Sequence, residues 1–143
     1  MYVKFTTRDN WAMSLPRLDL IERSTLWDRA DIVQPDVCAA GRISECRKIA
    51  ALASAHGIEC VPHAWGSAIG LAATLQFLAA LPDQPPSFRP MPPLLEFEQC
   101  KNPFRDRLSV EPIVQQRGKV QIPTGAGLGI EIDRSILDRY RVA

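Results

Sequence analysis

The chain has 143 residues, the length of one ordinary domain with room for a hydrophobic core. Its 17 basic and 16 acidic residues give a formal net charge of +1 and form no block of like charge, which argues against nucleic acid or an anionic membrane surface as a partner. The longest apolar stretch, residues 69–81, is too short to span a bilayer, and the N-terminus lacks the apolar region of a secretion signal. The sequence therefore predicts a soluble, cytoplasmic protein.

Strand and helix patterns alternate along the first two thirds of the chain. In chain order they predict a strand at 2–5, a helix at 18–27, a strand at 31–37, a helix that Ser44 caps and Gly57 ends, a strand at 58–61, a helix at 67–81 and a strand at 93–98. This alternation indicates parallel βα units. Beyond residue 100 we expect short strands at 110–113, 119–122 and 129–133 and a last helical turn at 135–140.

The four cysteines include no C-x-x-C pair, and three of them lie in apolar segments. A zinc site needs closer ligand pairs or nearby histidines. We therefore expect ordinary buried thiols in a reducing compartment, and neither a disulfide framework nor a metal cluster.

Each of the three predicted parallel strands finishes with an ionisable residue: Asp36, His63 and Glu96. In a βα-barrel, functional side chains lie at the carboxyl ends of the strands, and neighbouring strands are about 4.8 Å apart. We expect Asp36 to hydrogen-bond one ring nitrogen of His63, which leaves the other nitrogen to accept a proton from a substrate. A Glu96 kept protonated by its apolar neighbours would donate a hydrogen bond to a developing oxyanion.

Each of these residues also has an ordinary structural interpretation. His63 alone would be a structural histidine, Asp36 after Pro35 would cap the following turn, and Glu96 would be a solvated carboxylate. Trp65, just past His63, lines a substrate pocket or packs in the core. The occurrence of three ionisable residues at three successive strand ends is what favours a site.

Residues 31–80 and 94–133 closely resemble the C-terminal barrel half of the mandelate racemase and muconate lactonizing enzyme branch of the enolase superfamily. The resemblance rests on the Q-P-D strand end at 34–36, on the strand-end histidine 27 residues after Asp36, and on the P-T-G-x-G-L-G segment at 123–129. It implies an α/β fold that is the C-terminal part of a (β/α) barrel, incomplete at about three βα units, followed by short strands. It also divides the chain into a poorly matched segment, 1–17, and a partial barrel domain, 18–143.

The resemblance implies a role for each strand-end residue. Asp36 and His63 match the family's His-Asp dyad, and Glu96 matches the electrophile that hydrogen-bonds the substrate carboxylate. The implied reaction, typical of acid-sugar dehydratases and racemases, removes the proton α to a carboxylate of a small acid-sugar substrate. Mg²⁺ and hydrogen-bond donors stabilise the resulting enediolate.

Two parts of the family's site are missing from the chain. The metal carboxylates belong to earlier strands, residues 10–14 offer none at the last of these positions, and no Lys-x-Lys motif occurs. We therefore expect a fragment of a Mg²⁺-dependent enzyme that binds no metal alone and is inactive in isolation. Because three strands cannot close a barrel, strand edges would be exposed, and we expect a homo-oligomer or association with the missing barrel half. The alternative is a truncated, non-catalytic protein that acts only through association.

Overall fold

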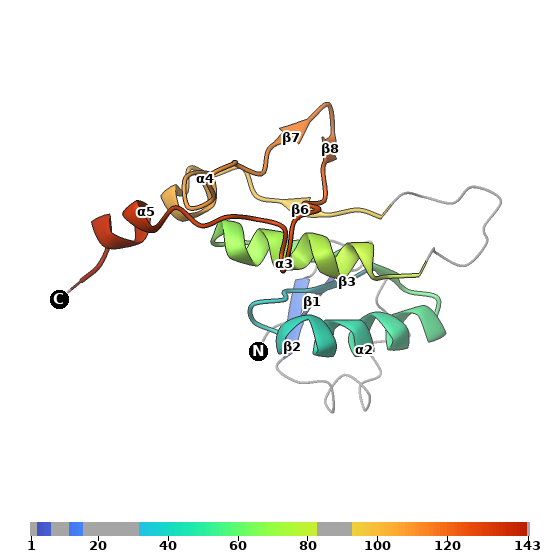
Figure 1. Ribbon diagram of the computed structural model, residues 1–143. Coiled ribbons are helices and arrows are strands. Elements are labelled where there is room, and N and C mark those ends of the chain that lie inside the picture. The colour runs from blue at the N-terminus through green and yellow to red at the C-terminus, as the bar shows by residue number, and fades with distance from the viewer. Residues whose placement is uncertain (1–2, 7–11, 16–31, 83–92, 143) are drawn as a thin grey trace.

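A computed structural model describes residues 3–6, 12–15, 32–82 and 93–142 (Figure 1). The elements are β1 (Val3–Thr6), β2 (Ala12–Leu15), β3 (Ile32–Pro35), α2 (Arg42–Ala55), β4 (Glu59–Cys60), β5 (His63–Ala64), α3 (Ala68–Ala79), β6 (Glu96–Phe97), α4 (Pro103–Asp106), β7 (Gln115–Gln116), β8 (Lys119–Val120) and α5 (Arg134–Arg139). The helix predicted at 18–27 lies outside the described residues. No helix in the described part of the chain is long and apolar enough to cross a bilayer.

The predicted alternation of strands and helices over residues 31–98 is confirmed. β3 and β4 pair in parallel, with Ile32 opposite Glu59, and β5 and β6 pair in parallel, with Ala64 opposite Phe97. A bridge between Asp36 and His63 continues the same parallel ladder, so three chain segments lie side by side. Figure 1 shows α2 and α3 as two long helices that run alongside each other.

Two helix boundaries test the predicted caps. The cap of α2 is Gly41 and not Ser44, because the turn after β3 needs a left-handed residue there (φ 98°) and no side chain caps the helix. Gly57 follows the end of α2 with φ 68°, as predicted. Ser67 caps α3 by accepting a hydrogen bond from the amide of Gly70.

The edge of β3 is covered, contrary to expectation. β1 pairs with β3 in antiparallel orientation, from Val3 opposite Pro35 to Thr6 opposite Ile32, and β2 pairs with the far side of β1. The sheet order is β2-β1-β3-β4. All neighbouring strands in a βα-barrel are parallel. The antiparallel pairing of β1 with β3 therefore differs from the pairing of barrel strands. The backbone groups of β1 satisfy those of β3, and that edge is not open.

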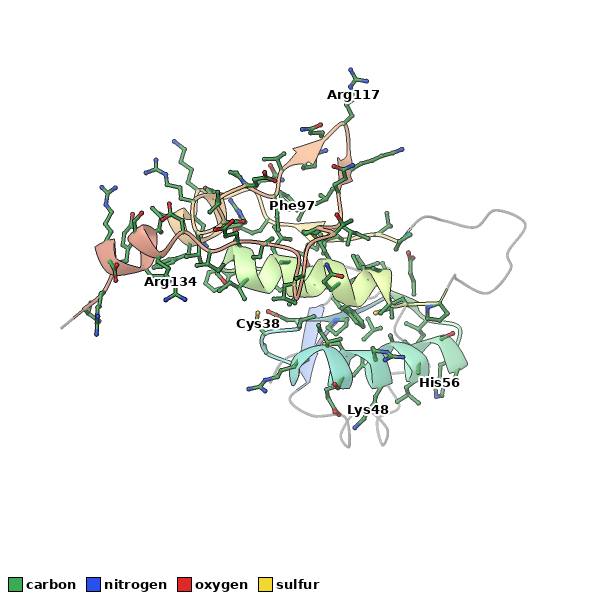
Figure 2. All side chains as sticks on the ribbon, viewed as in Figure 1. Cys38, Lys48, His56, Phe97, Arg117 and Arg134 are labelled. Carbon is green, nitrogen blue, oxygen red and sulfur yellow. The ribbon has the colours of Figure 1, made fainter. Side chains whose placement is uncertain are left out.

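The strands predicted beyond residue 100 are only partly present. Residues 110–113 and 129–133 form no strands, and a single antiparallel bridge pairs Ser109, just before the first segment, with Ile132 in the second. β8 lies within the predicted 119–122 and pairs with β7, which has no apolar alternation to reveal it. Arg117 and Gly118 turn this hairpin with φ of 51° and 77°, the left-handed pair that two-residue hairpin loops favour. Figure 2 shows Arg117 at the tip, pointing away from the helices.

α3 is buried on two sides, which explains why its sequence is apolar almost throughout. On one side Phe77 joins the larger cluster, which consists of Val33, Val37, Ala40, Cys46, Ile49, Ala50, Ala53, Ile58, Cys60 and Phe77. On the other side Leu71 and Leu75 pack with Ala64, against Leu95 and Phe97 among others. One helix therefore joins β3 and α2 to the β5–β6 pair.

The C-terminal segment is fixed to α3 by a polar contact. The Gln76 side-chain amide donates hydrogen bonds to the carbonyl oxygens of Pro123 (2.7 Å) and Leu128 (3.3 Å). Gly129 closes this loop with φ 79°, and a Cβ there would lie 2.7 Å from backbone atoms of Pro123. The glycines of the P-T-G-x-G-L-G segment thus have a local structural use, a tight loop seated on the helix.

The position of Phe77 predicts a large effect of its removal. Phe77→Ala should lower the free energy of unfolding by about 3–5 kcal/mol, because it leaves a cavity between α3 and α2. Urea unfolding followed by circular dichroism measures the change. Val142→Ala is the control, since Val142 is 89% exposed and its truncation should cost within about 0.5 kcal/mol. Equal effects of the two substitutions would contradict the described core.

Candidate active site

The three strand-end residues lie in line. The backbone of Asp36 bridges that of His63, and His63 is paired with Glu96 on the other side. Residues opposite each other in a parallel ladder project to the same face of the sheet. The prediction that these residues lie at one height on three neighbouring parallel segments is confirmed. Asp36 directly follows β3, whereas His63 and Glu96 are the first residues of β5 and β6 and do not end them.

His63 contacts Glu96. The distance from His63 Nδ1 to Glu96 Oε2 is 2.8 Å, and the two side chains are 31% and 39% exposed. An ionised carboxylate can only accept a hydrogen bond, so Nδ1 is the donor whenever Glu96 is charged. The imidazole then keeps Nε2 as its proton-accepting nitrogen, and it is exposed enough to meet a small solute.

Gln34 contacts the same carboxylate oxygen. Its side-chain amide donates to Glu96 Oε2 at 3.0 Å, and Gln34 itself is buried. Sequence reasoning did not select this residue. Two signals point to it: it lies two positions before Asp36, so the strand period of two puts both on one face, and it is a polar residue inside the apolar strand β3.

Asp36 has a different partner from the one predicted. Its Oδ1 accepts a hydrogen bond from the amide of Cys38 at 2.7 Å, and its carbonyl accepts from Ala39 and Ala40. Aspartate commonly captures an amide two residues ahead in this way. The predicted Asp36–His63 hydrogen bond is therefore wrong for this structure, because a local turn holds the aspartate while the longer Glu96 reaches the imidazole. The turn-capping alternative describes Asp36.

A buried arginine holds the chain just after Glu96. Arg105 Nη1 donates to the Glu98 carbonyl (2.8 Å) and to Glu98 Oε2 (2.7 Å), and Nη2 donates to the carbonyl of Cys100. The Cys100 amide donates to Glu98 Oε1 at 2.8 Å. Asn102 extends the connection by donating to the carbonyl of Gly66, in the loop after β5. The segments that follow β5 and β6 are thus tied together beside the His63–Glu96 pair.

The comparisons with known proteins identify the family. The model of the enolase C-terminal domain-like family matches residues 17–136. The chain belongs to this family. Its α/β fold is that of the enolase C-terminal domain and is consistent with part of a TIM-barrel enzyme.

The chain is similar to enzymes of acid-sugar metabolism in this enolase-superfamily group. It is 47% identical to the D-galactarolactone cycloisomerase of Agrobacterium fabrum over 112 residues, which cover 78% of this chain and 30% of that enzyme. It is 33% identical to the arabinonate dehydratase of Saccharolobus solfataricus over 111 residues, 78% of this chain and 27% of that enzyme. The chain thus spans less than a third of the length of these relatives.

Solved structures of the superfamily share the fold of this chain. The 3,6-anhydro-D-galactonate cycloisomerase of Zobellia galactanivorans superposes with a TM-score of 0.66 at 34% identity, over 79% of this chain and 30% of that one. The mandelate racemase/muconate lactonizing enzyme of Jannaschia sp. CCS1 gives 0.64 at 30% identity, over 80% of this chain and 27% of that one.

Enolase-superfamily enzymes generally use Mg²⁺. Within residues 32–82 and 93–142, no three His, Cys, Asp or Glu side chains are grouped so that they could hold a metal ion. Mg²⁺ prefers several hard oxygen ligands, and the Asp36–His63–Glu96 line does not supply them. The described residues therefore do not fit the metal.

Trp65 is 64% exposed, so the core-packing interpretation of this residue is wrong. It lies in the loop after β5, two residues beyond His63. A role in lining a substrate pocket stays a prediction.

The four cysteines are free, and Cys46 and Cys60 are buried as expected. Cys38 and Cys100 are exposed, so the expectation of buried thiols is wrong for these two. Burial raises the pKa of the Cys46 and Cys60 thiols to about 12, so both are protonated core residues at neutral pH. Cys38 is exposed and lies beside the first turn of α3, where its Sγ would be 2.7 Å from a Cβ at Gly70. Glycine at position 70 therefore lets the turn after Asp36 approach the helix.

The Glu98 contacts predict a pH dependence of stability. Hydrogen bonds from Cys100, followed by the Arg105 charge, hold the pKa of Glu98 below its ordinary 4.5. A lowered pKa stabilises the fold above pH 4.5, and this contribution is lost as the pH falls through the folded-state value. Glu98→Gln should therefore lower the thermal midpoint near neutral pH. The gap to the wild-type protein should narrow as the pH falls below 4.5, and a gap that is constant with pH would contradict the assignment.

Proposed function

We propose that this chain contributes the general base of an enzyme that removes the proton α to the carboxylate of an acid sugar. The observation that carries the proposal is the 2.8 Å contact between His63 Nδ1 and Glu96 Oε2, which lie opposite each other on the neighbouring parallel strands β5 and β6. A histidine whose tautomer a carboxylate fixes is a typical general base near neutral pH. Membership in the enolase C-terminal domain-like family supports the reaction class.

In the proposed step, His63 Nε2 takes the α-proton. The electron pair of the C–H bond moves into the substrate carboxylate and gives an enediolate. A dehydratase then expels a β-hydroxyl, a cycloisomerase makes or opens a ring, and a racemase returns a proton to the other face. The names of the relatives include both dehydratases and cycloisomerases, so the chain's own substrate is assigned only to the class of acid sugars and their lactones.

The other strand-end residues have supporting roles in this proposal. Glu96 Oε2 accepts a hydrogen bond from the Nδ1–H of His63 and so holds the imidazole. The hydrogen bond from a protonated Glu96 to the substrate, which the family resemblance implies, stays a prediction. Asp36, one strand away, adds a negative charge that favours the imidazolium formed by proton transfer. Trp65, exposed in the loop after β5, gives the substrate an apolar contact.

We infer that turnover needs residues beyond those described. Three observations support this: the chain spans less than a third of its relatives' length, its sequence has no Lys-x-Lys motif, and the described residues offer no group of metal ligands. The remaining site residues would come from a further part of the protein or from another chain.

A chimera tests the base assignment. Residues 31–142 would replace the matching segment of the A. fabrum cycloisomerase, a replacement that 47% identity makes feasible. In the active chimera, His63→Asn should lower kcat by roughly 100- to 10,000-fold, the usual contribution of a general base. His56→Asn is the matched control, because His56 lies at the opposite end of α2 from Cys38 and the strand carboxyl ends (Figure 2).

The outcomes of this experiment separate the two inferences. A chimera whose His63→Asn variant keeps its activity would refute the base assignment. The 143-residue chain alone should show no α-proton exchange into D₂O with acid sugars and Mg²⁺. Exchange that His63→Asn abolishes would contradict the need for further residues.

A second candidate function is association without catalysis. Among the described residues, ten large apolar side chains are exposed, including Val110 (57%), Val114 (51%) and Trp65 (64%). Apolar surface of this kind marks interaction sites when it is contiguous. Sedimentation of the purified chain should show a dimer or a larger species, and a cooperatively melting monomer would count against association.

A further inference from the structure

We propose that Gln34 is the positioning residue of His63, and that it acts through the Glu96 carboxylate to set the imidazole tautomer. The inference rests on the proposed function only in taking His63 as the base. It assigns to a buried amide on β3 the orienting task that the sequence pattern gives to Asp36.

Two contacts converge on one oxygen atom. Glu96 Oε2 lies 3.0 Å from Gln34 Nε2 and 2.8 Å from His63 Nδ1. Gln34 Nε2 can only donate a hydrogen bond, so Glu96 Oε2 is the acceptor in this contact. The same oxygen then faces the Nδ1–H of His63. The amide and the imidazole are both satisfied by one orientation of the carboxylate.

Strand order explains why Gln34 reaches Glu96. The three parallel segments are β3, then β4 and β5, then β6, so His63 lies on the segment between those that carry Gln34 and Glu96. Because Asp36 is level with His63, Gln34 lies two residues lower on the same face. The Gln34 amide therefore supports the carboxylate from below while the imidazole contacts it at its own level.

Burial makes this support firm. Gln34 is 9% exposed, whereas the His63 and Glu96 side chains are more than 30% exposed. Breaking a hydrogen bond made by a buried amide is unfavourable, so the Gln34–Glu96 contact opposes rotation of the carboxylate. Asp36 makes a local contact instead: its Oδ1 accepts a hydrogen bond from the Cys38 amide at 2.7 Å.

The imidazole tautomer tests the proposal directly. The full chain contains only His56 and His63, so ¹⁵N-histidine labelling gives two ring systems in long-range ¹H–¹⁵N spectra. At a pH where both rings are neutral, the wild-type chain should hold the His63 proton mainly on Nδ1. The reference is the tautomer distribution of the same ring in urea-unfolded chain.

Two substitutions of Gln34 remove the support in different ways. Gln34→Met deletes the amide at similar volume, and Gln34→Asn keeps an amide but shortens its reach. In every variant that remains folded by circular dichroism, the Nδ1-protonated share of His63 should fall towards the unfolded reference. Asp36→Asn should leave that share unchanged, and His56 should not respond.

Three results would overturn the proposal. They are a wild-type His63 with the unfolded tautomer distribution, a folded Gln34 variant with the wild-type distribution, and an Asp36→Asn variant that shifts the distribution as far as Gln34→Asn does. None of these measurements depends on turnover, so they decide the role of Gln34 even where the chimera shows that His63 is not the base.

Discussion

The parallel ladder that joins Asp36 to His63 and His63 to Glu96 fixes three ionisable side chains at one height. With strands about 4.8 Å apart, the imidazole has an acid on either side, and backbone position alone does not choose between them. Two things determine which acid contacts the imidazole: the length of its side chain and whether a nearby backbone amide already binds its carboxylate. The Asp36 side chain is short, and the Cys38 amide binds its carboxylate within the same turn. The longer Glu96 side chain reaches the imidazole, and the same carboxylate oxygen accepts a hydrogen bond from Gln34.

α3 links the main apolar cluster to the strands of this ladder. Its Phe77 face packs on α2 and β3, and its Leu71 face packs under β5 and β6, so the relative height of the strand ends depends on one helix buried on two sides. The Arg105–Glu98 contacts then hold the chain beyond β6. A site made of half-exposed polar groups is in this way supported by apolar packing and by one buried ion pair.

Most of this framework could be predicted from the sequence, because buried strands and helices leave strong apolar patterns; Val33 and Cys60 mark two such strands. Contacts for which two or more partners compete could not be predicted from the sequence. Residues 110–113 look like a strand, yet Val110 is exposed and the nearby bridge is made by Ser109, outside the segment. Family motifs pair Asp36 with His63, whereas a two-residue turn redirects the aspartate. Gln34 was missed because a polar residue within a strand can face solvent, pair locally or contact a distant side chain, and the sequence does not distinguish these cases.

The relatives in the enolase C-terminal domain-like family include acid-sugar dehydratases and cycloisomerases. In this chain, neighbouring strands bring His63, Glu96 and Gln34 into one hydrogen-bonded cluster. Cross-strand nuclear Overhauser effects in the folded chain test this register most directly. The ladder predicts backbone contacts of His63 with both Asp36 and Glu96, and contacts of the His63 ring with the Glu96 γ-methylene. Contacts displaced by one residue would put His63 and Glu96 on opposite faces of the sheet and contradict the site.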